Sequence, residues 1–199
     1  MADTTALLTR AEAEQRDFVT LTRALTDDQW AAPSLCAKWT VRETVMHTAI
    51  HTHQTLRESV KANREAVRRR DEPSGTLVDS LAAPLYAKSP WELRLQAGEL
   101  MIHQQDIRRP LGIARTPAVE AVTPVAVFFA SRNFTVNSRT AAEGLRLEAT
   151  DSVFAHGAGP LVRGSTVALT MTMAGRLAYC DDVEGPGTPI LRRRAVSTG

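Results

Sequence analysis

Two strong helix-start signals constrain the fold of this chain more than any other feature. Thr40-Val41-Arg42-Glu43 has the Thr-x-x-Glu spacing of a capping box, in which the threonine hydroxyl and the glutamate carboxylate bind free backbone amides at a helix start. Ser89-Pro90-Trp91-Glu92 combines a capping serine with a proline that suits the first helical position. We therefore expect long helices over residues 41–69 and 89–109, the second of which ends at Pro110 and Gly112.

Two further segments have the pattern of long helices. Residues 4–25 carry apolar side chains at helical intervals, and residues 118–134 are mostly apolar, with Pro124 as a possible kink. A weaker helical signal covers residues 76–88, where Pro84 interrupts the pattern. Four main helices predict a helical bundle.

The pattern changes after Asn137. Residues 144–151 alternate like a strand, residues 159–178 combine turn signals with a helix, and residues 188–194 (TPILRRR) have the look of a closing strand. We therefore expect a mainly α protein, with a helical bundle at residues 1–139 and a small C-terminal α/β domain at residues 140–199.

Composition favours a soluble, cytoplasmic protein. The 199 residues are 43% hydrophobic and carry a net charge of +2 from 24 basic and 22 acidic side chains, so neither a nucleic-acid partner nor a membrane partner is expected. No cationic start precedes an apolar block, and no apolar run approaches the roughly 20 residues that span a bilayer. Two cysteines, Cys36 and Cys180, are too few for a disulfide framework.

Three side chains on the two best-defined helices form a candidate metal site. Glu99 and His103 are four residues apart and so share a helix face, and His47 can reach them if its helix is a neighbour in the bundle. Two imidazoles and one carboxylate suit zinc and leave one position open, although iron, nickel and manganese also fit. The spacing alone leaves a rival set of Glu43, His47 and His51, which also share a face.

The other candidate site residues can be explained by structural roles at least as well as by functional ones. Glu43 serves better as the capping-box partner, and we expect His51 and His53 to line a pocket or face solvent. Cys36 fits a packed loop residue better than a nucleophile. Asp106 either orients the His103 imidazole or pairs with Arg109, and the sequence favours neither.

Two ordered motifs resemble a known family. The run LTDDQWAAPSLCAKWTVRETVMHTA (residues 25–49) resembles the N-terminal signature of the mycothiol-dependent maleylpyruvate isomerase and DinB-like families, and GELMIHQQDIRRPLG (residues 98–112) is similar to their second signature. The resemblance implies a DinB-like four-helix bundle that holds a divalent metal, zinc above all, through His47, Glu99 and His103. It also implies a small C-terminal α/β domain.

Two functions follow from these expectations. The first is an enzyme that uses a low-molecular-weight thiol, by resemblance mycothiol, at an open metal position for isomerisation or S-transfer on a small electrophile. The second is a metal-dependent module that binds a small ligand or regulates without catalysis, since a fold does not fix a function. Saturable thiol binding and turnover that needs both metal and thiol would separate them.

Overall fold

The computed structural model describes residues 2–36, 39–53, 72–87, 89–134 and 136–196. By its internal contacts the chain divides into two compact units, Met1–Arg115 and Thr116–Gly199. The first unit is helical, and the second combines helices with a small sheet. The mainly α fold expected from the sequence, with a small C-terminal sheet, is confirmed.

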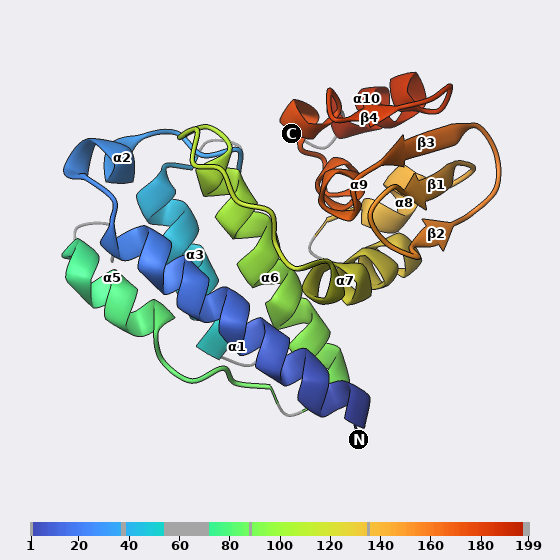
Figure 1. The fold of residues 1–199 in the computed structure, drawn as a ribbon. Helices are drawn as coiled ribbons and strands as arrows, with labels where there is room; N and C mark the ends of the chain where they lie inside the picture. The colour runs from blue at the N-terminus through green and yellow to red at the C-terminus, as the bar shows by residue number, and fades with distance from the viewer. Residues whose placement is uncertain (1, 37–38, 54–71, 88, 135, 197–199) are drawn as a thin grey trace. The chain divides into compact units, whose positions relative to one another are not determined.

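Apart from the short α2 (Asp27–Ala31), the described residues of the first unit form four helices: α1 (Ala2–Arg23), α3 (Val41–His53), α5 (Ser74–Leu81) and α6 (Pro90–Arg108). Helix α6 packs against α1 and α3, and α5 packs against the same two helices from the other side (Figure 1). Helix α2 leads from α1 to α3. In this arrangement α3 and α6 are neighbours.

Both helix-start signals act as expected. The Thr40 amide donates to Glu43 Oε2 at 2.8 Å, and the Glu43 amide donates to Thr40 Oγ1 at 3.3 Å, which completes the capping box. The Ser89 hydroxyl accepts from the Glu92 amide at 3.2 Å at the start of α6. The expected continuation of the second helix over residues 54–69 lies outside the described residues.

The end of α6 is closed by a glycine turn. The Ile113 amide donates to the Arg108 carbonyl at 2.9 Å, and Gly112 between them has φ 66°. Residues other than glycine rarely adopt this left-handed backbone conformation, so the turn needs a glycine at that position. Pro110 and Gly112 therefore end the helix where the sequence predicts.

The core of the first unit surrounds α6. Phe18 of α1, Val45 of α3 and Leu100 and Ile107 of α6 are completely or almost completely buried in one apolar cluster. Nearly every side chain of α6 from Gln96 to Arg108 is buried as well, including its polar ones. Buried polar groups must find partners, so the polar side chains of α6 are the place to look for a site.

One expected bundle helix belongs elsewhere. Helix α7 (Val119–Ser131), expected as the fourth bundle helix, packs on α8 (Ser138–Ala142) and α9 (Thr166–Met173) within the second unit. Among the described residues of the first unit, α5 packs beside α1 and α3. Helix α7 is apolar over most of its surface, which lets it serve as the core helix of a small unit. The boundary expected at residue 139 therefore falls inside the second compact unit, and the division into independently folding domains stays a prediction.

A four-stranded sheet lies in the second unit, in the order β2-β1-β3-β4. Its strands are β1 (Arg146–Ala149), β2 (Ala155–His156), β3 (Leu161–Gly164) and β4 (Val183–Glu184). The central pair β1 and β3 is parallel, and each edge strand is antiparallel to its neighbour. Helix α9 packs against β1 and β3, and the 3-10 turn η1 (Leu177–Tyr179) follows it.

The prediction of a closing strand at residues 188–194 is wrong. These residues belong to a helix, α10 (Thr188–Val196). Leu191 and Ala195, four residues apart, are both buried, whereas Arg192 and Arg193 are exposed. This spacing of buried side chains has the period of a helix rather than the alternation of a strand.

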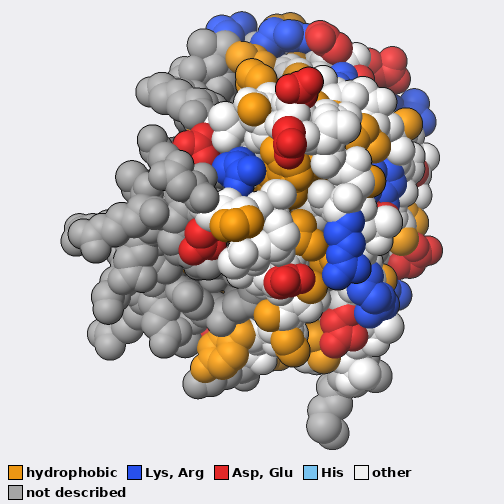
Figure 2. All heavy atoms as spheres, turned by 90° about the vertical axis from the view of Figure 1, so that its left-hand side faces the viewer, with side chains coloured by type: hydrophobic (Ala, Val, Ile, Leu, Met, Phe, Trp, Pro, Cys, Tyr) orange, Lys and Arg blue, Asp and Glu red, His pale blue; other side chains and the backbone are white. Residues whose placement is uncertain are grey.

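The surface of the described residues is mixed in charge. Acidic and basic side chains are interspersed with apolar ones on the face drawn in Figure 2. Among the described helices, none combines the length and the apolar character needed to cross a membrane.

Candidate metal centre

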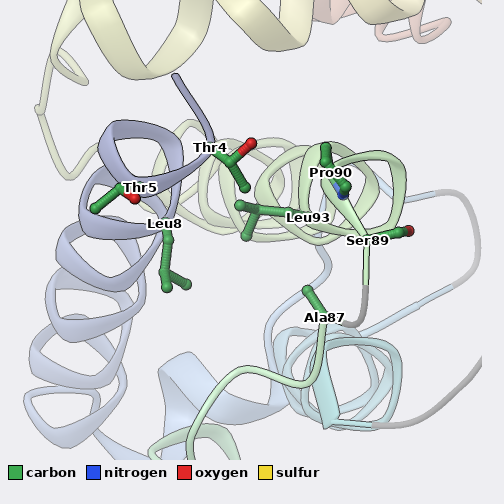
Figure 3. Close-up of a pocket in the computed structure, with 7 residues that line it drawn as sticks. All are labelled: Thr4, Thr5, Leu8, Ala87, Ser89, Pro90 and Leu93. Atoms are coloured by element: carbon green, nitrogen blue, oxygen red, sulfur yellow. The ribbon is translucent and has the colours of Figure 1, made fainter. Parts of the chain in front are cut away.

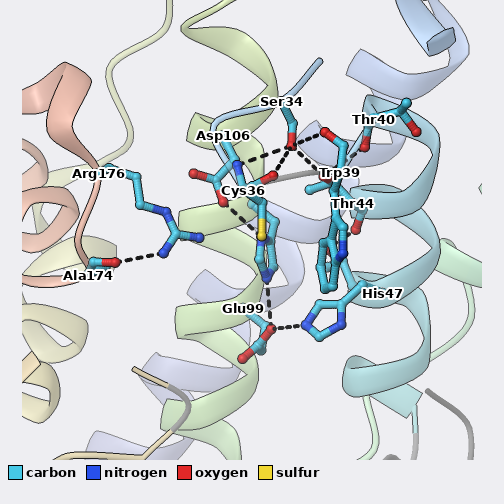
Figure 4. Close-up of polar contacts among 12 residues, drawn as sticks. Ser34, Cys36, Trp39, Thr40, Thr44, His47, Glu99, Asp106, Ala174 and Arg176 are labelled. Atoms are coloured by element: carbon cyan, nitrogen blue, oxygen red, sulfur yellow. Dashed lines mark hydrogen bonds and ion pairs between the residues drawn. The ribbon is translucent and has the colours of Figure 1, made fainter. Parts of the chain in front are cut away.

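Helices α3 and α6 bring the three expected ligands together. His47 projects from α3, and Glu99 and His103 project from successive turns of α6. Because α3 packs on α6, the His47 imidazole and the Glu99 carboxylate point toward each other across the seam (Figure 4). The pair that is close in sequence and the residue that is distant therefore meet at one place.

Both imidazoles direct the same nitrogen at the same oxygen. His47 Nε2 lies 3.2 Å from Glu99 Oε2, and His103 Nε2 lies 3.1 Å from it. Neighbouring ligand atoms in a tetrahedral centre with metal bonds of about 2.0–2.1 Å are about 3.3 Å apart. The two imidazole–carboxylate distances thus have the length expected between ligands of one metal ion, and the His47 and His103 rings are 5.0 Å apart between centroids.

Burial and mutual contacts shift the pKa values of these groups. Burial would raise the pKa of Glu99, but the hydrogen bonds from His103 and His47 hold it well below its usual range. Burial outweighs the Glu99 contact at His47, whose pKa is lowered, with a further lowering from His103. The site therefore combines an ionised carboxylate with a neutral imidazole, the forms that metal ligands need.

His103 is held by a second carboxylate. Its Nδ1 lies 3.0 Å from Asp106 Oδ2, and Asp106 is completely buried. Burial alone would lower the pKa of His103, but hydrogen bonds to Asp106 and Glu99 raise it to about 9. Of the two roles that the sequence left open for Asp106, the structure has the contact with the His103 imidazole.

The loop before α3 covers the cluster. Trp39 packs against His47, with ring centroids 4.6 Å apart, and its ring is 6.4 Å from that of His103. The Leu35 amide donates to the Asp106 carbonyl at 2.9 Å, which ties this loop to α6. The position of Trp39 directly before the capping box is the sequence signal that could have pointed to its place at the site.

The comparisons with known proteins agree with this architecture. Residues 11–84 match the family model described as the mycothiol maleylpyruvate isomerase N-terminal domain. This segment is thus similar to that domain. No curated protein matches the sequence.

Two solved structures share the fold of the chain. They are crystal structures of the mycothiol-dependent maleylpyruvate isomerase and of a mutant of it, each with a TM-score of 0.66, 16% sequence identity, and 93% of both chains covered. The likeness extends beyond the matched family domain to nearly the whole chain. At this identity it establishes a common fold, which includes the bundle that carries His47, Glu99 and His103.

His51 also lies at the cluster formed by His47, Glu99 and His103. Its ring is stacked on that of His47, with centroids 4.1 Å apart and planes inclined by 35°. The cluster contains three donor atoms within 4.8 Å of one another, one each from His47, His51 and Glu99. The rival set therefore contains Glu99 in place of Glu43, which is engaged in the capping box. The side chain of His53 lies outside the described residues.

Cys36 approaches the other side of His103. Donor atoms of Cys36, His103 and Asp106 lie within 4.8 Å of one another, so the thiol is closer to the site than the sequence suggested. Both cysteines are free thiols. Cys180 is buried in the second unit, and its burial raises its pKa.

The arginines at the end of α6 have structural partners. Arg108 Nη2 lies 2.6 Å from Asp17 Oδ2 on α1. Arg115 binds both oxygens of the buried Glu14, at 2.7 and 2.9 Å. These ion pairs join α1 to the end of α6 and to the segment that follows it. They give Arg108 a structural role in place of binding a carboxylate substrate.

A pocket of about 190 Å³ lies away from the cluster, between α1 and the start of α6 (Figure 3). Its lining is mainly apolar and contains none of the candidate ligands: Thr4, Thr5, Leu8, Ala87, Ser89, Pro90 and Leu93. The chemistry-bearing side chains thus gather at the α3–α6 seam and not in this pocket.

Proposed function

We propose that this chain is a metal-dependent enzyme that uses a low-molecular-weight thiol, mycothiol by its family, on a small electrophile. The observation that carries the proposal is the convergence of His47 Nε2 and His103 Nε2 on one oxygen of Glu99. These three side chains would hold one divalent ion, with zinc as the expected metal. The match of residues 11–84 to the isomerase domain supports the choice of thiol.

The metal would supply Lewis acidity, which lowers the pKa of a coordinated water or thiol and polarises a substrate carbonyl. Glu99 provides a negative charge to the site, and His47 and His103 provide neutral donors once the His103 proton has left. Asp106 holds the His103 ring in one orientation through its Nδ1. Trp39 covers one side of His47 and limits access of water to it.

The expected reaction is addition of the thiol to a carbon–carbon double bond. A carbon–sulfur bond forms and the adjacent carbon gains a proton, after which the former double bond can rotate. Loss of the same proton and thiol gives the isomer and regenerates the thiol, so nothing is consumed. If the thiol stays on the carbon, the same chemistry becomes S-transfer.

The test is calorimetric titration of the zinc-loaded protein with mycothiol, followed by a turnover assay with maleylpyruvate and mycothiol. We expect saturable one-to-one thiol binding, and isomerisation that requires both thiol and metal. Glutathione serves as the matched control thiol. A metal-loaded protein that neither binds mycothiol nor turns over would contradict the enzyme proposal and favour a metal-dependent binding module.

A further inference from the structure

His51 has an unexplained nitrogen next to the proposed metal centre. It lies one turn after His47 on α3, and its ring stacks on that of His47. Its Nε2 is buried and has no hydrogen-bond partner in the described part of the chain. A buried ring nitrogen without a partner is costly, so a missing ligand is the natural explanation.

The position of His51 relative to Glu99 favours a cation as that ligand. A His51 ring nitrogen lies within 4.8 Å of a Glu99 oxygen and of a His47 nitrogen, close enough for all three to reach one ion. Glu99 Oε2 is also the atom on which His103 Nε2 converges. A cation held by His47, His51 and Glu99 would therefore share the Glu99 carboxylate with His103.

We propose that His51 is a fourth protein ligand of the metal. The inference rests on the metal centre of the proposed function but not on the thiol reaction. Four protein ligands would fill a tetrahedral site, so a centre that still admits a thiol has at least five positions. Zinc can expand to five-coordination, and a nitrogen-rich set of this kind also suits cobalt or nickel.

Simple ring packing is the rival explanation for His51, and His51→Phe separates the two. Phenylalanine keeps an aromatic ring beside His47 but removes the nitrogen donor. His51→Gln is a second variant that keeps a polar side chain at the seam. His156→Phe is the matched control, because His156 lies on β2 of the second unit, away from α3 and α6 in the chain.

The experiment is titration of the full-length, metal-free protein and each variant with Co²⁺, with visible absorption as the readout. Tetrahedral Co²⁺ absorbs much more strongly in the visible than five- or six-coordinate Co²⁺. With water in the fifth position, we expect five-coordinate Co²⁺ and weak bands in the unmodified protein and in His156→Phe. We expect stronger bands, together with at least about tenfold weaker binding, in His51→Phe and His51→Gln.

The outcomes separate this inference from the metal centre itself. If Co²⁺ binds with the same affinity and spectrum in His51→Phe as in the unmodified protein, His51 is not a ligand. If the unmodified protein binds no Co²⁺, the metal centre fails and the inference fails with it. Circular dichroism checks the fold of each variant. If His51→Phe is unfolded, the spectrum and affinity of His51→Gln decide between the two explanations in the same way.

Discussion

His103 Nδ1 lies 3.0 Å from Asp106 Oδ2, one turn further along α6, while the opposite nitrogen of the same ring faces Glu99. A ring held in this way has one nitrogen fixed by a carboxylate and the other free to bind a metal. Metal-ligating histidines almost always have such a partner on their second nitrogen. Asp106 is therefore the residue that orients His103.

Replacing Asp106 tests this role. We expect Asp106→Asn to weaken zinc binding about 10- to 100-fold, because the His103 ring loses its charged partner and part of its basicity. The same change should lower the pKa of His103 in the metal-free protein from its value of about 9, since the Asp106 contact helps to raise it. Competition with a zinc chelator and NMR titration of the imidazole measure the two effects. An unchanged affinity would mean that Asp106 does not support a ligand.

The raised pKa of His103 predicts how the stability of the metal-free protein depends on pH. Its folded value of about 9 exceeds the ordinary 6.5, so its contribution is complete below pH 6.5 and is lost as pH rises to 9. We expect His103 to account for a loss of up to about 3 kcal/mol in unfolding free energy across this window. Urea denaturation at pH 6.5 and 9.5 measures it. His103→Gln should reduce the difference in unfolding free energy between the two pH values. An equally large difference in that variant would show that another group causes the pH dependence.

The local part of the fold could be predicted from the sequence, and the long-range part could not. Helix starts at Thr40 and Ser89 depend on neighbouring residues and were predicted correctly. The assignment of α7 to the second unit depends on which apolar surfaces meet, and a helix that is apolar over most of its surface fits either unit. Residues 188–194 were misread because a short run gives little periodicity to separate helix from strand.

The candidate site, too, could be predicted from the sequence only in its local part. The spacing of Glu99 and His103 indicated a shared face, but that His47 faces them depends on the packing of α3 on α6. The position of His51 beside Glu99 required the structure, because the sequence paired it equally well with Glu43. A capping role for Glu43, already favoured by the sequence, is what removes that alternative.

Cys36 offers a second test of which groups bind the metal. Its thiol lies near His103 and Asp106, which together could form a rival cation site. We expect Cys36→Ser to retain one zinc per chain with affinity within about threefold of the unmodified protein, because a serine hydroxyl would replace a residue that does not ligate. Elemental analysis and chelator competition check this. Loss of the metal in this variant would show that Cys36 is a ligand and would contradict the assignment of the site to His47, Glu99 and His103.

The ion pairs at the end of α6 predict a stability effect unrelated to metal. Arg115→Ala removes the two hydrogen bonds that the guanidinium donates to the carboxylate of Glu14, which is only 5% exposed, and leaves that charge buried with Gln104 Nε2 3.5 Å from Oε2. We expect a loss of about 3–5 kcal/mol in unfolding free energy. Arg16→Ala is the control, since Arg16 is exposed on the same helix as Glu14 and should change stability by less than about 0.5 kcal/mol. Equal effects of the two variants would show that the Glu14 pair is not stabilising.

The most direct test of the central claim is the metal content of the protein after zinc loading and removal of excess metal, compared with that of His103→Ala and His47→Ala. With His47, Glu99 and His103 as ligands, we predict one zinc per chain in the unmodified protein and none in either variant. One zinc per chain retained in His103→Ala would contradict the assignment of the site.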